Sequence, residues 1–503
     1  MENQEQQRRR ETHAPERNPN PCPLYRKCGG CQLQNMSYQR QLHWKQELVE
    51  RLLGRFHRVN PIIGMEHPYH YRNKVQAAFA LDRRKQIVSG VYQASTHRVV
   101  PVESCMIEDE TADRIVGTIR KLMKDFKMEP YNEDTGRGLV RHVLVKRGFV
   151  SGQVMVVMVT VSPILPAKNN FVKALRKAHP EITTILQNVN NRATSMVLGE
   201  SEKVLYGPGY IEESLCGCVF RISAKSFYQI NPVQTEVLYN KAIELAGFTG
   251  KETVVDAYCG TGTIGLIAAK RGAGHVTGVE LNQDAVRDAI SNAKRNGIKN
   301  VYFYNADAGE FLSAMADEGE TVDVVLMDPP RAGSDEQFLT SLAGLAPKKI
   351  VYISCNPETL QRDLQFLVRA GYHVQEIQPV DMFPHTNHVE TVVLLSHKKP
   401  DSYIHIDVEF GEGEGKIPVD KIVQRAEQYK PKERVTYKRI KEYILEKYGF
   451  KVHTAYIAEV KRSLGLPMYD APNAVEKLKQ ARKHPTPEKV EAIKDALHYF
   501  AVI

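Results

Sequence analysis

The second half of the chain alternates short apolar runs with longer segments in which apolar residues recur every three or four positions. A short apolar run predicts a buried strand, and the longer spacing predicts an amphipathic helix. Strands that alternate with helices in this way are typical of an α/β fold with a doubly wound, largely parallel sheet. The predicted strands are 254–257, 275–280, 301–305, 322–327, 349–354 and 388–395.

The pattern before residue 225 is different. A helical spacing covers 38–53, and residues 70–220 then mix short β-rich runs, such as 75–81 and 154–161, with turns and charged helices. This mixture predicts an α+β region. Residues 1–20 are polar, rich in Pro and Asn and balanced in charge, so a disordered tail is expected. The expected domains are a tail (1–20), an α+β region (21–224), a sheet-forming domain (225–398) and a C-terminal extension (399–503).

The extension changes character along its length. Residues 401–427 are acidic and contain glycine, whereas 428–503 carry an excess of Lys and Arg. Two helical patterns, 436–447 and 453–464, flank a Tyr-Gly-Phe turn and together resemble a helix-turn-helix. A small helical bundle with a solvated basic face explains the same pattern. Nucleic-acid binding and a structural role therefore both stay open for this segment.

The 503 residues carry a formal net charge of +9, which favours a polyanionic partner such as nucleic acid but is spread thinly. No apolar run is long enough to span a membrane, and the N-terminus does not resemble a signal peptide. The chain has eight cysteines, three of them within 22–31, which fits a reducing compartment better than a disulfide framework. A cytoplasmic monomer without membrane contact is expected.

A glycine-rich turn follows the first strand of the sheet-forming domain. Gly260, Gly262 and Gly265 precede a helix, in a context where glycines let the backbone approach a ligand at the helix N-terminus. Glu280 ends the next predicted strand and is placed to accept hydrogen bonds from ribose hydroxyls. This pattern alone does not separate NAD from S-adenosylmethionine.

The sequence Asp328-Pro329-Pro330-Arg331 favours the methyl donor. Two prolines make the backbone rigid and hold a carboxylate beside a planar base, and a nicotinamide enzyme has no evident need for them. Arg331 stands where an aromatic residue would serve methylation of an exocyclic amine, which argues against that reaction. The alternative for Asp328 is a turn cap, and Asp307 fits adenine contact or helix capping equally.

Cys355 follows the predicted strand 349–354, where a loop opens toward whatever the sheet binds, and is a candidate nucleophile. Uracil C5 is a poor carbon nucleophile. A thiolate that adds to C6 forms an enolate, whose C5 can attack a sulfonium methyl group. The proton left on C5 must then be removed, and the carboxylate of Glu390 is a candidate base. A free cysteine is more often a core residue and a loop glutamate more often solvated, so the hypothesis depends on the combination.

Five motifs resemble, in order, those of the RNA 5-methyluridine methyltransferases, over roughly residues 21–397. They are Ser-Phe-Tyr-Gln-Ile-Asn (226–231), Asp-Ala-Tyr-Cys-Gly-Thr-Gly (256–262), Asp-Pro-Pro-Arg-Ala-Gly (328–333), Ser-Cys-Asn-Pro (354–357) and Phe-Pro-His-Thr-x-His-Val-Glu (383–390). The resemblance implies a Rossmann-like, S-adenosylmethionine-dependent methyltransferase domain. It implies Cys355 as the nucleophile, Glu390 as the base, and a target uridine flipped out of its stack near Phe227. The implied S-adenosylmethionine contacts are Gln229, Tyr258, Glu280 and Asp328.

Cys22, Cys28 and Cys31 have the spacing of metal ligands, and Cys105 is the candidate for a fourth. Thiolates suit either zinc or an iron–sulfur cluster, so the residues alone leave the metal open. The resemblance implies a [4Fe–4S] cluster, since ribosomal members similarly carry one, with a role in folding or RNA docking. The remaining cysteines, 216, 218 and 259, are expected to be structural.

The cluster cysteines resemble those of 23S rRNA enzymes more than those of cluster-free tRNA enzymes. Methylation of uridine C5 in 23S rRNA is therefore the predicted function, with the same chemistry on tRNA as the alternative. A non-enzymatic alternative is an iron–sulfur protein that binds or folds RNA. RNA binding alone, however, does not require the thiol of Cys355 and the carboxylate of Glu390. Many cluster-containing members begin with a small β-barrel RNA-binding domain. Here the basic extension 399–503 is expected to supply that RNA contact.

Overall fold

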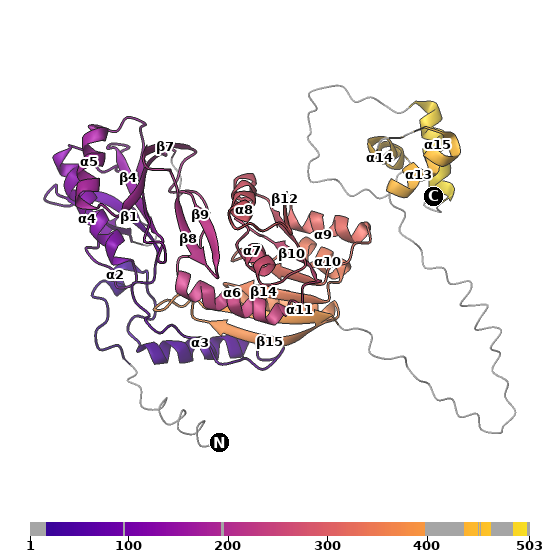
Figure 1. The fold of residues 1–503 in the computed structure, drawn as a ribbon, viewed down its shortest axis with the longest axis horizontal. Coiled ribbons are helices and arrows are strands. Elements are labelled where there is room, and N and C mark those ends of the chain that lie inside the picture. Colours follow the sequence, from indigo (N-terminus) through magenta and orange to yellow (C-terminus); the bar gives the residue numbers. More distant parts are fainter. Residues whose placement is uncertain are drawn as a thin grey trace, which may run out of the picture. The chain divides into compact units, whose positions relative to one another are not determined.

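The computed structural model describes residues 17–93, 96–192, 196–397, 437–450, 452, 454–463 and 486–499. The chain divides into two compact units, one up to residue 403 and one from residue 404. The described part of the first unit contains two seven-stranded sheets and a two-stranded hairpin (Figure 1). Its first described residue, Arg17, forms a β-bridge with Met36. Residues 1–16, where the disordered tail was predicted, lie outside the described part.

The first sheet has the strand order β3-β2-β1-β4-β5-β6-β7 and is antiparallel except between β5 and β6. Helices α4 and α5 pack an apolar core against this sheet. Side chains of β5 also join the core that contains the β8–β9 hairpin, so every residue of β5 is buried. The elements are β1 (Lys74–Leu81), β2 (Ile87–Tyr92), β3 (Val99–Pro101), α4 (Glu110–Asp125), β4 (Val140–Arg147), β5 (Val154–Thr160), α5 (Lys168–Ala178), β6 (Ile182–Val189), β7 (Ser201–Tyr206), β8 (Ile211–Leu215) and β9 (Cys218–Ile222).

The second sheet has the order β12-β11-β10-β13-β14-β16-β15. Its first five strands are parallel, and β16 runs antiparallel to both β14 and β15. The predicted doubly wound sheet is confirmed, although β15 was not predicted and β16 begins two residues later than expected. The strands are β10 (Thr253–Ala257), β11 (His275–Glu280), β12 (Val301–Asn305), β13 (Val324–Met327), β14 (Lys349–Ser354), β15 (Tyr372–Val380) and β16 (Glu390–His397).

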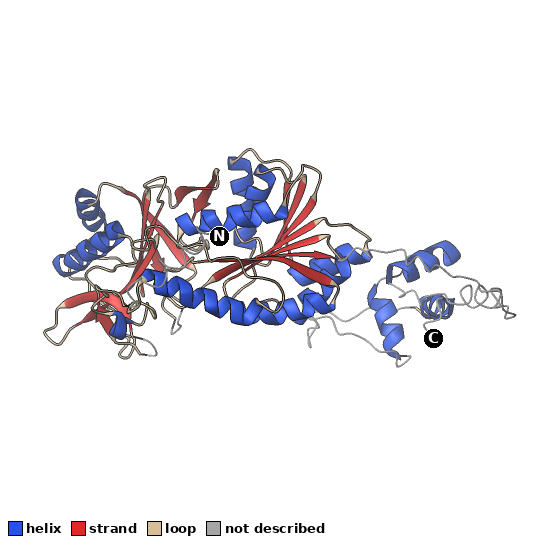
Figure 2. Cartoon of the chain, turned by 90° about the horizontal axis from the view of Figure 1, so that it is seen from below, coloured by secondary structure: helices blue, strands red, loops and turns tan. Residues whose placement is uncertain are grey.

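Helices cover both faces of the second sheet (Figure 2). Residues of α6 (Pro232–Ala246), α7 (Thr263–Lys270) and α8 (Gln283–Arg295) join one core. Residues of α9 (Ala308–Asp317), α10 (Glu336–Leu345) and α11 (Pro357–Arg369) join the other.

Helix α3 (Tyr38–Leu53) has the predicted bounds, begins at the N-cap Ser37 and follows the short helix α2 (Tyr25–Cys28). It buries Val49 and Leu53 in the core on the α9–α11 face of the second sheet. The N-terminal segment thus packs on the sheet that follows it by about 200 residues in sequence.

The second unit contains α13 (Tyr437–Tyr448), α14 (Thr454–Ser463) and α15 (Pro487–Tyr499) within its described residues. The first two match the predicted helix pair, and the third was not predicted. Apolar side chains of all three, among them Ile444, Ile457 and Ile493, form one core, so the described residues form a small helical bundle. Its contact with RNA stays a prediction. None of the helices described in either unit is long and apolar enough to cross a membrane.

Candidate active site

The predicted site residues gather at one edge of the second sheet. Tyr258 follows β10, Glu280 ends β11, Asp328 follows β13 and Cys355 follows β14. Because β11, β10, β13 and β14 are parallel neighbours, their carboxyl ends lie in a row. The order reverses between β10 and β13, and such a switch point is where open α/β sheets bind ligands.

Strand pairing places the candidate nucleophile opposite the candidate base. Ser354 at the end of β14 pairs with Thr391 in antiparallel β16. The next residues toward the sheet edge are Cys355 on one strand and Glu390 on the other. Cys355 is half-buried, whereas Glu390 is only 4% exposed. A base flipped into this edge would meet a thiol and a carboxyl group from neighbouring strands.

The charges around this pair act on both groups. Burial, together with smaller contributions from Glu390 and Asp328, raises the pKa of Cys355 to about 11, and Arg331 opposes this rise. Burial also raises the pKa of Glu390 to about 8, again with Asp328 adding and Arg331 opposing. Burial holds the pKa of Asp328 near 7. Arg331 is therefore a positive charge that favours the ionised form of both Cys355 and Glu390.

Arg331 also links the loops of the site. Its guanidinium contacts the ring of His388, with Nη2 3.0 Å from Nε2. Asn356 Nδ2 and Thr359 Oγ1 each donate to the carbonyl oxygen of Arg331 at 3.3 Å, which ties its loop to the loop after Cys355. Sequence reasoning quoted His388 within a motif but assigned it no role. Only the fold brings it to Arg331, which lies 57 residues away in sequence.

The glycine turn has the geometry of a ligand cradle. Gly260 and Gly262 have φ of 54° and 79°, in the left-handed region that favours glycine. A Cβ at Gly262 would lie 2.7 Å from Phe303, whereas one at Gly260 would meet open space. Glu280 accepts hydrogen bonds from the Gly260 and Asn282 amides at 3.0 and 2.7 Å. Its carboxylate is thus fixed beside the backbone that a nucleotide would approach.

Tyr258 and Gln229 are the other two predicted cofactor contacts at the carboxyl edge of the second sheet. Tyr258 has φ of 63°, which is rare for a bulky residue, and its ring packs 5.0 Å from Phe338. Gln229 lies in the loop before α6, and its side chain acts on the hydroxyl of buried Tyr239, whose pKa it lowers. Sequence reasoning missed Tyr239, whose pKa is raised by burial and by nearby Asp328. An aromatic residue on an apolar helix face gives no signal that its hydroxyl reaches the site.

Phe227 and Asp307 were the remaining residues considered for contact with the substrate or the cofactor. Phe227, expected near the target uridine, is 69% exposed and free to stack on a base. Asp307 caps α9 by accepting a hydrogen bond from the Glu310 amide at 3.0 Å. Helix capping is therefore the observed role of Asp307, and adenine contact stays a prediction.

The four candidate cluster ligands line one pocket. Cys22, Cys28, Cys31 and Cys105 surround it together with apolar side chains that include Ile107. Within the described ranges, no group of three or more His, Cys, Asp or Glu side chains is arranged to hold a metal ion. The four sulfurs are therefore neighbours that are not in ligand geometry. The other three cysteines, 216, 218 and 259, are buried, and their structural role stays a prediction.

A doubly wound sheet with a glycine turn beside its switch point has the α/β fold of S-adenosylmethionine-dependent methyltransferases. Residues 37–398 match the family model described as tRNA (Uracil-5-)-methyltransferase. The chain belongs to this family and is an RNA methyltransferase of the uracil-C5 class.

Relatives and a solved structure agree with this assignment. An uncharacterized RNA methyltransferase of Halalkalibacterium halodurans is 43% identical over 390 residues, which cover 76% of this chain and 85% of the relative. One from Clostridium acetobutylicum is 43% identical, covering 74% of this chain and 82% of the relative. The crystal structure of Pyrococcus abyssi tRNA (uracil-54, C5)-methyltransferase in complex with S-adenosyl-L-homocysteine is 29% identical, with a TM-score of 0.62. That match covers 75% of this chain and 87% of the archaeal one.

Proposed function

We propose that this enzyme methylates uridine C5 in 23S rRNA, with S-adenosylmethionine as donor and Cys355 as a covalent nucleophile. The observation that carries the proposal is the placement of Cys355 opposite Glu390, beside Asp328, at the carboxyl edge of the sheet. RNA methylation needs no such pair when an exocyclic amine is the target. At C5 of uracil, both a nucleophile and a base are required.

Cys355 and Glu390 have separate roles in the proposed reaction. The thiolate of Cys355 forms a bond to C6, and the electron pair of the C5–C6 double bond moves into the ring enolate. S-adenosylmethionine supplies the electrophilic methyl group that C5 attacks. Glu390 then takes the proton from C5, and the electron pair of that C–H bond re-forms the double bond as the C6–S bond breaks. Cys355 returns as a thiolate, and the proton remains on Glu390 until it exchanges with solvent.

S-adenosylmethionine would bind along the row of strand ends. The open space at Gly260 and the fixed carboxylate of Glu280 suit a nucleoside with ribose hydroxyls. Gln229, Tyr258 and Asp328 complete the proposed contacts. Bound S-adenosyl-L-homocysteine in the Pyrococcus abyssi enzyme supports this class of ligand.

The set of thiols around the cysteine pocket, rather than their present geometry, supports the proposal of a [4Fe–4S] cluster. Four thiols from two segments line the same pocket, and an all-thiolate ligand set is what such clusters use. Cys22, Cys28, Cys31 and Cys105 would hold the cluster, whose role would be structural because thiolate addition to uracil needs no electron transfer.

Anaerobically purified wild-type protein is expected to contain about four iron atoms and four sulfides per chain. Cys31→Ser should lose most of the iron, whereas Cys216→Ser, at a buried cysteine outside the pocket, should retain it. Iron and acid-labile sulfide assays read out both variants. Zinc in place of iron, or equal iron in the two variants, would refute the proposed cluster.

The same chemistry could act on uridine in 23S rRNA or in tRNA. The four cysteines support 23S rRNA, whereas the name of the archaeal enzyme supports tRNA. Purified enzyme should be incubated with labelled S-adenosylmethionine and with unmodified ribosomal RNA or tRNA, followed by nucleoside mass spectrometry. We expect labelled 5-methyluridine from ribosomal RNA alone. Label in tRNA alone would establish the alternative, and label in neither would contradict both. The enzyme's monomeric state and cytoplasmic location stay predictions.

A further inference from the structure

The loop 381–389 joins β15 to β16 and leads directly into Glu390. Five successive carbonyl oxygens in this loop each accept a hydrogen bond from a residue far away in the sequence. The donors and acceptors are Gln234 Nε2 to Asp381 (3.0 Å), Asn231 Nδ2 to Met382 (2.8 Å), Lys45 Nζ to Phe383 (3.0 Å), the Tyr71 hydroxyl to Pro384 (2.9 Å) and Leu33 N to His385 (2.9 Å). Loops are usually the mobile parts of a fold. This loop is instead held from outside through its first five residues.

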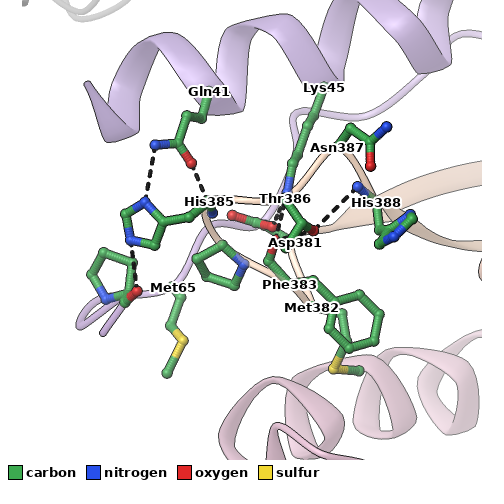
Figure 3. A network of polar contacts seen from close by, with 12 residues as sticks. Gln41, Lys45, Met65, Asp381, Met382, Phe383, His385, Thr386, Asn387 and His388 are labelled. Carbon is green, nitrogen blue, oxygen red and sulfur yellow. Dashed lines mark hydrogen bonds and ion pairs between the residues drawn. The ribbon is translucent and has the colours of Figure 1, made fainter. Parts of the chain in front are cut away.

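Helix α3 adds a fully buried ion pair to these contacts at the start of the loop (Figure 3). Lys45 Nζ lies 2.6 Å from Asp381 Oδ1, and both side chains are fully buried. The Tyr38 hydroxyl donates to the other carboxylate oxygen of Asp381 at 2.8 Å. A buried ion pair is costly unless further hydrogen bonds satisfy it, and here Tyr38 and the Phe383 carbonyl do so. The pair is therefore a specific joint between α3 and the start of the loop.

Gln41, one turn before Lys45, holds the centre of the loop. Its Oε1 accepts a hydrogen bond from the His385 amide at 2.8 Å. Its Nε2 consequently donates to His385 Nδ1 at 3.1 Å, and His385 Nε2 donates to the Pro68 carbonyl at 2.9 Å. His385 has φ of 69°, an unfavourable conformation for a residue other than glycine. Gln41 thus fixes both the backbone and the ring of a residue in a conformation that needs support.

We propose that Gln41 and Lys45 are positioning residues, through which α3 holds loop 381–389 so that Glu390 faces the proton on C5. The inference rests on the proposed role of Glu390 as the base. The base must lie within hydrogen-bond reach of that proton, and a shift of about 1 Å in such a group slows its step by roughly 100-fold. The contacts to the loop also reach the cysteine pocket, because Leu33, whose amide donates to the His385 carbonyl, follows Cys31 by two residues.

The test compares the same substitution at two positions of α3. Gln41→Met keeps a long unbranched side chain but removes both hydrogen bonds to His385, whereas Gln39→Met changes an exposed residue. For Gln41→Met we expect kcat to fall about 10- to 100-fold, with KM for S-adenosylmethionine unchanged. Covalent protein–RNA adduct should accumulate, and hydrogen exchange at the His385 amide should speed up. Gln39→Met should match wild type in all four measurements.

Tyr71→Phe is a milder second variant, which removes only the hydroxyl bonded to the Pro384 carbonyl. It should change the same readouts in the same direction and by less, and it applies even where Gln41→Met does not fold. Glu390→Gln is the reference for adduct accumulation. A reference that traps no adduct would refute Glu390 as the base and hence the proposed function. The other outcome is that Glu390→Gln traps adduct, but Gln41→Met and Tyr71→Phe turn over like wild type or accumulate no adduct. This outcome would overturn the positioning role and leave the proposed function standing.

Discussion

Replacement of Cys355 by alanine is expected to lower uridine methylation by roughly 10⁴-fold or more, because C5 then lacks the thiolate that we propose activates it from C6. S-adenosylmethionine affinity should change little, since the glycine turn and Glu280 lie on other strands. Single-turnover transfer of labelled methyl to RNA measures the first effect, and calorimetric titration with S-adenosylmethionine measures the second.

The matched control is Cys216→Ala, which removes a buried thiol outside the site and should keep turnover close to that of wild type. Cys355→Ser should be as inactive as the alanine variant, because a serine hydroxyl ionises far less readily than a thiol. Residual methylation above one per cent of wild type in both Cys355 variants would contradict covalent catalysis.

The pKa shifts give this step a characteristic pH dependence. Reaction needs Cys355 as thiolate and Glu390 as carboxylate, and burial raises both pKa values. The rate of this step should therefore rise as the pH is raised through 8 toward 11, and the positive charge of Arg331, which opposes both shifts, should extend activity to lower pH. The site therefore combines burial, which favours the neutral forms of Cys355 and Glu390, with a positive charge that favours their ionised forms.

Most of the sheet and its edge could be predicted from the sequence. A strand such as 349–354 is buried over almost its whole length and centres on an apolar run, so its bounds and the residue that follows it could be predicted directly. Strand β15 was missed because its alternating residues Tyr372 to Gln378 resemble a solvated hairpin arm. In the structure it pairs with β16 along nearly its whole length.

What the sequence could not provide is the contact between distant segments. The core-facing positions of α3 include Gln41 and Lys45 where apolar residues are usual, and this departure was the available signal. Their partners, Asp381 and His385, lie more than 300 residues away, so no local pattern could pair them. The same holds for the Arg331–His388 contact, which depends on the register of β14 and β16.

Replacement of Glu390 by glutamine is expected to slow turnover about 10²- to 10⁴-fold, the usual range for loss of a general base. The thiol should still add to C6 and methyl transfer should still occur, but the adduct cannot be resolved without removal of the C5 proton. Covalent protein–RNA complex carrying the labelled methyl group should accumulate, measured by denaturing gel electrophoresis. Glu358→Gln, an exposed carboxyl on α11 near the same edge, is the matched control and should release its RNA.

The same variant has a separate effect on stability. The folded-state pKa of Glu390, about 8, is raised above its unfolded value, so its contribution to stability is complete below that lower value and is lost as pH rises toward 8. Glutamine does not titrate. Relative to wild type, Glu390→Gln should therefore gain up to roughly 4 kcal/mol of unfolding free energy between pH 5 and pH 8, measured by urea denaturation. A gain in stability without trapped adduct would mean that Glu390 is a buried acid but not the base. Trapped adduct without the gain would mean that the charge of Arg331 already compensates the burial of Glu390.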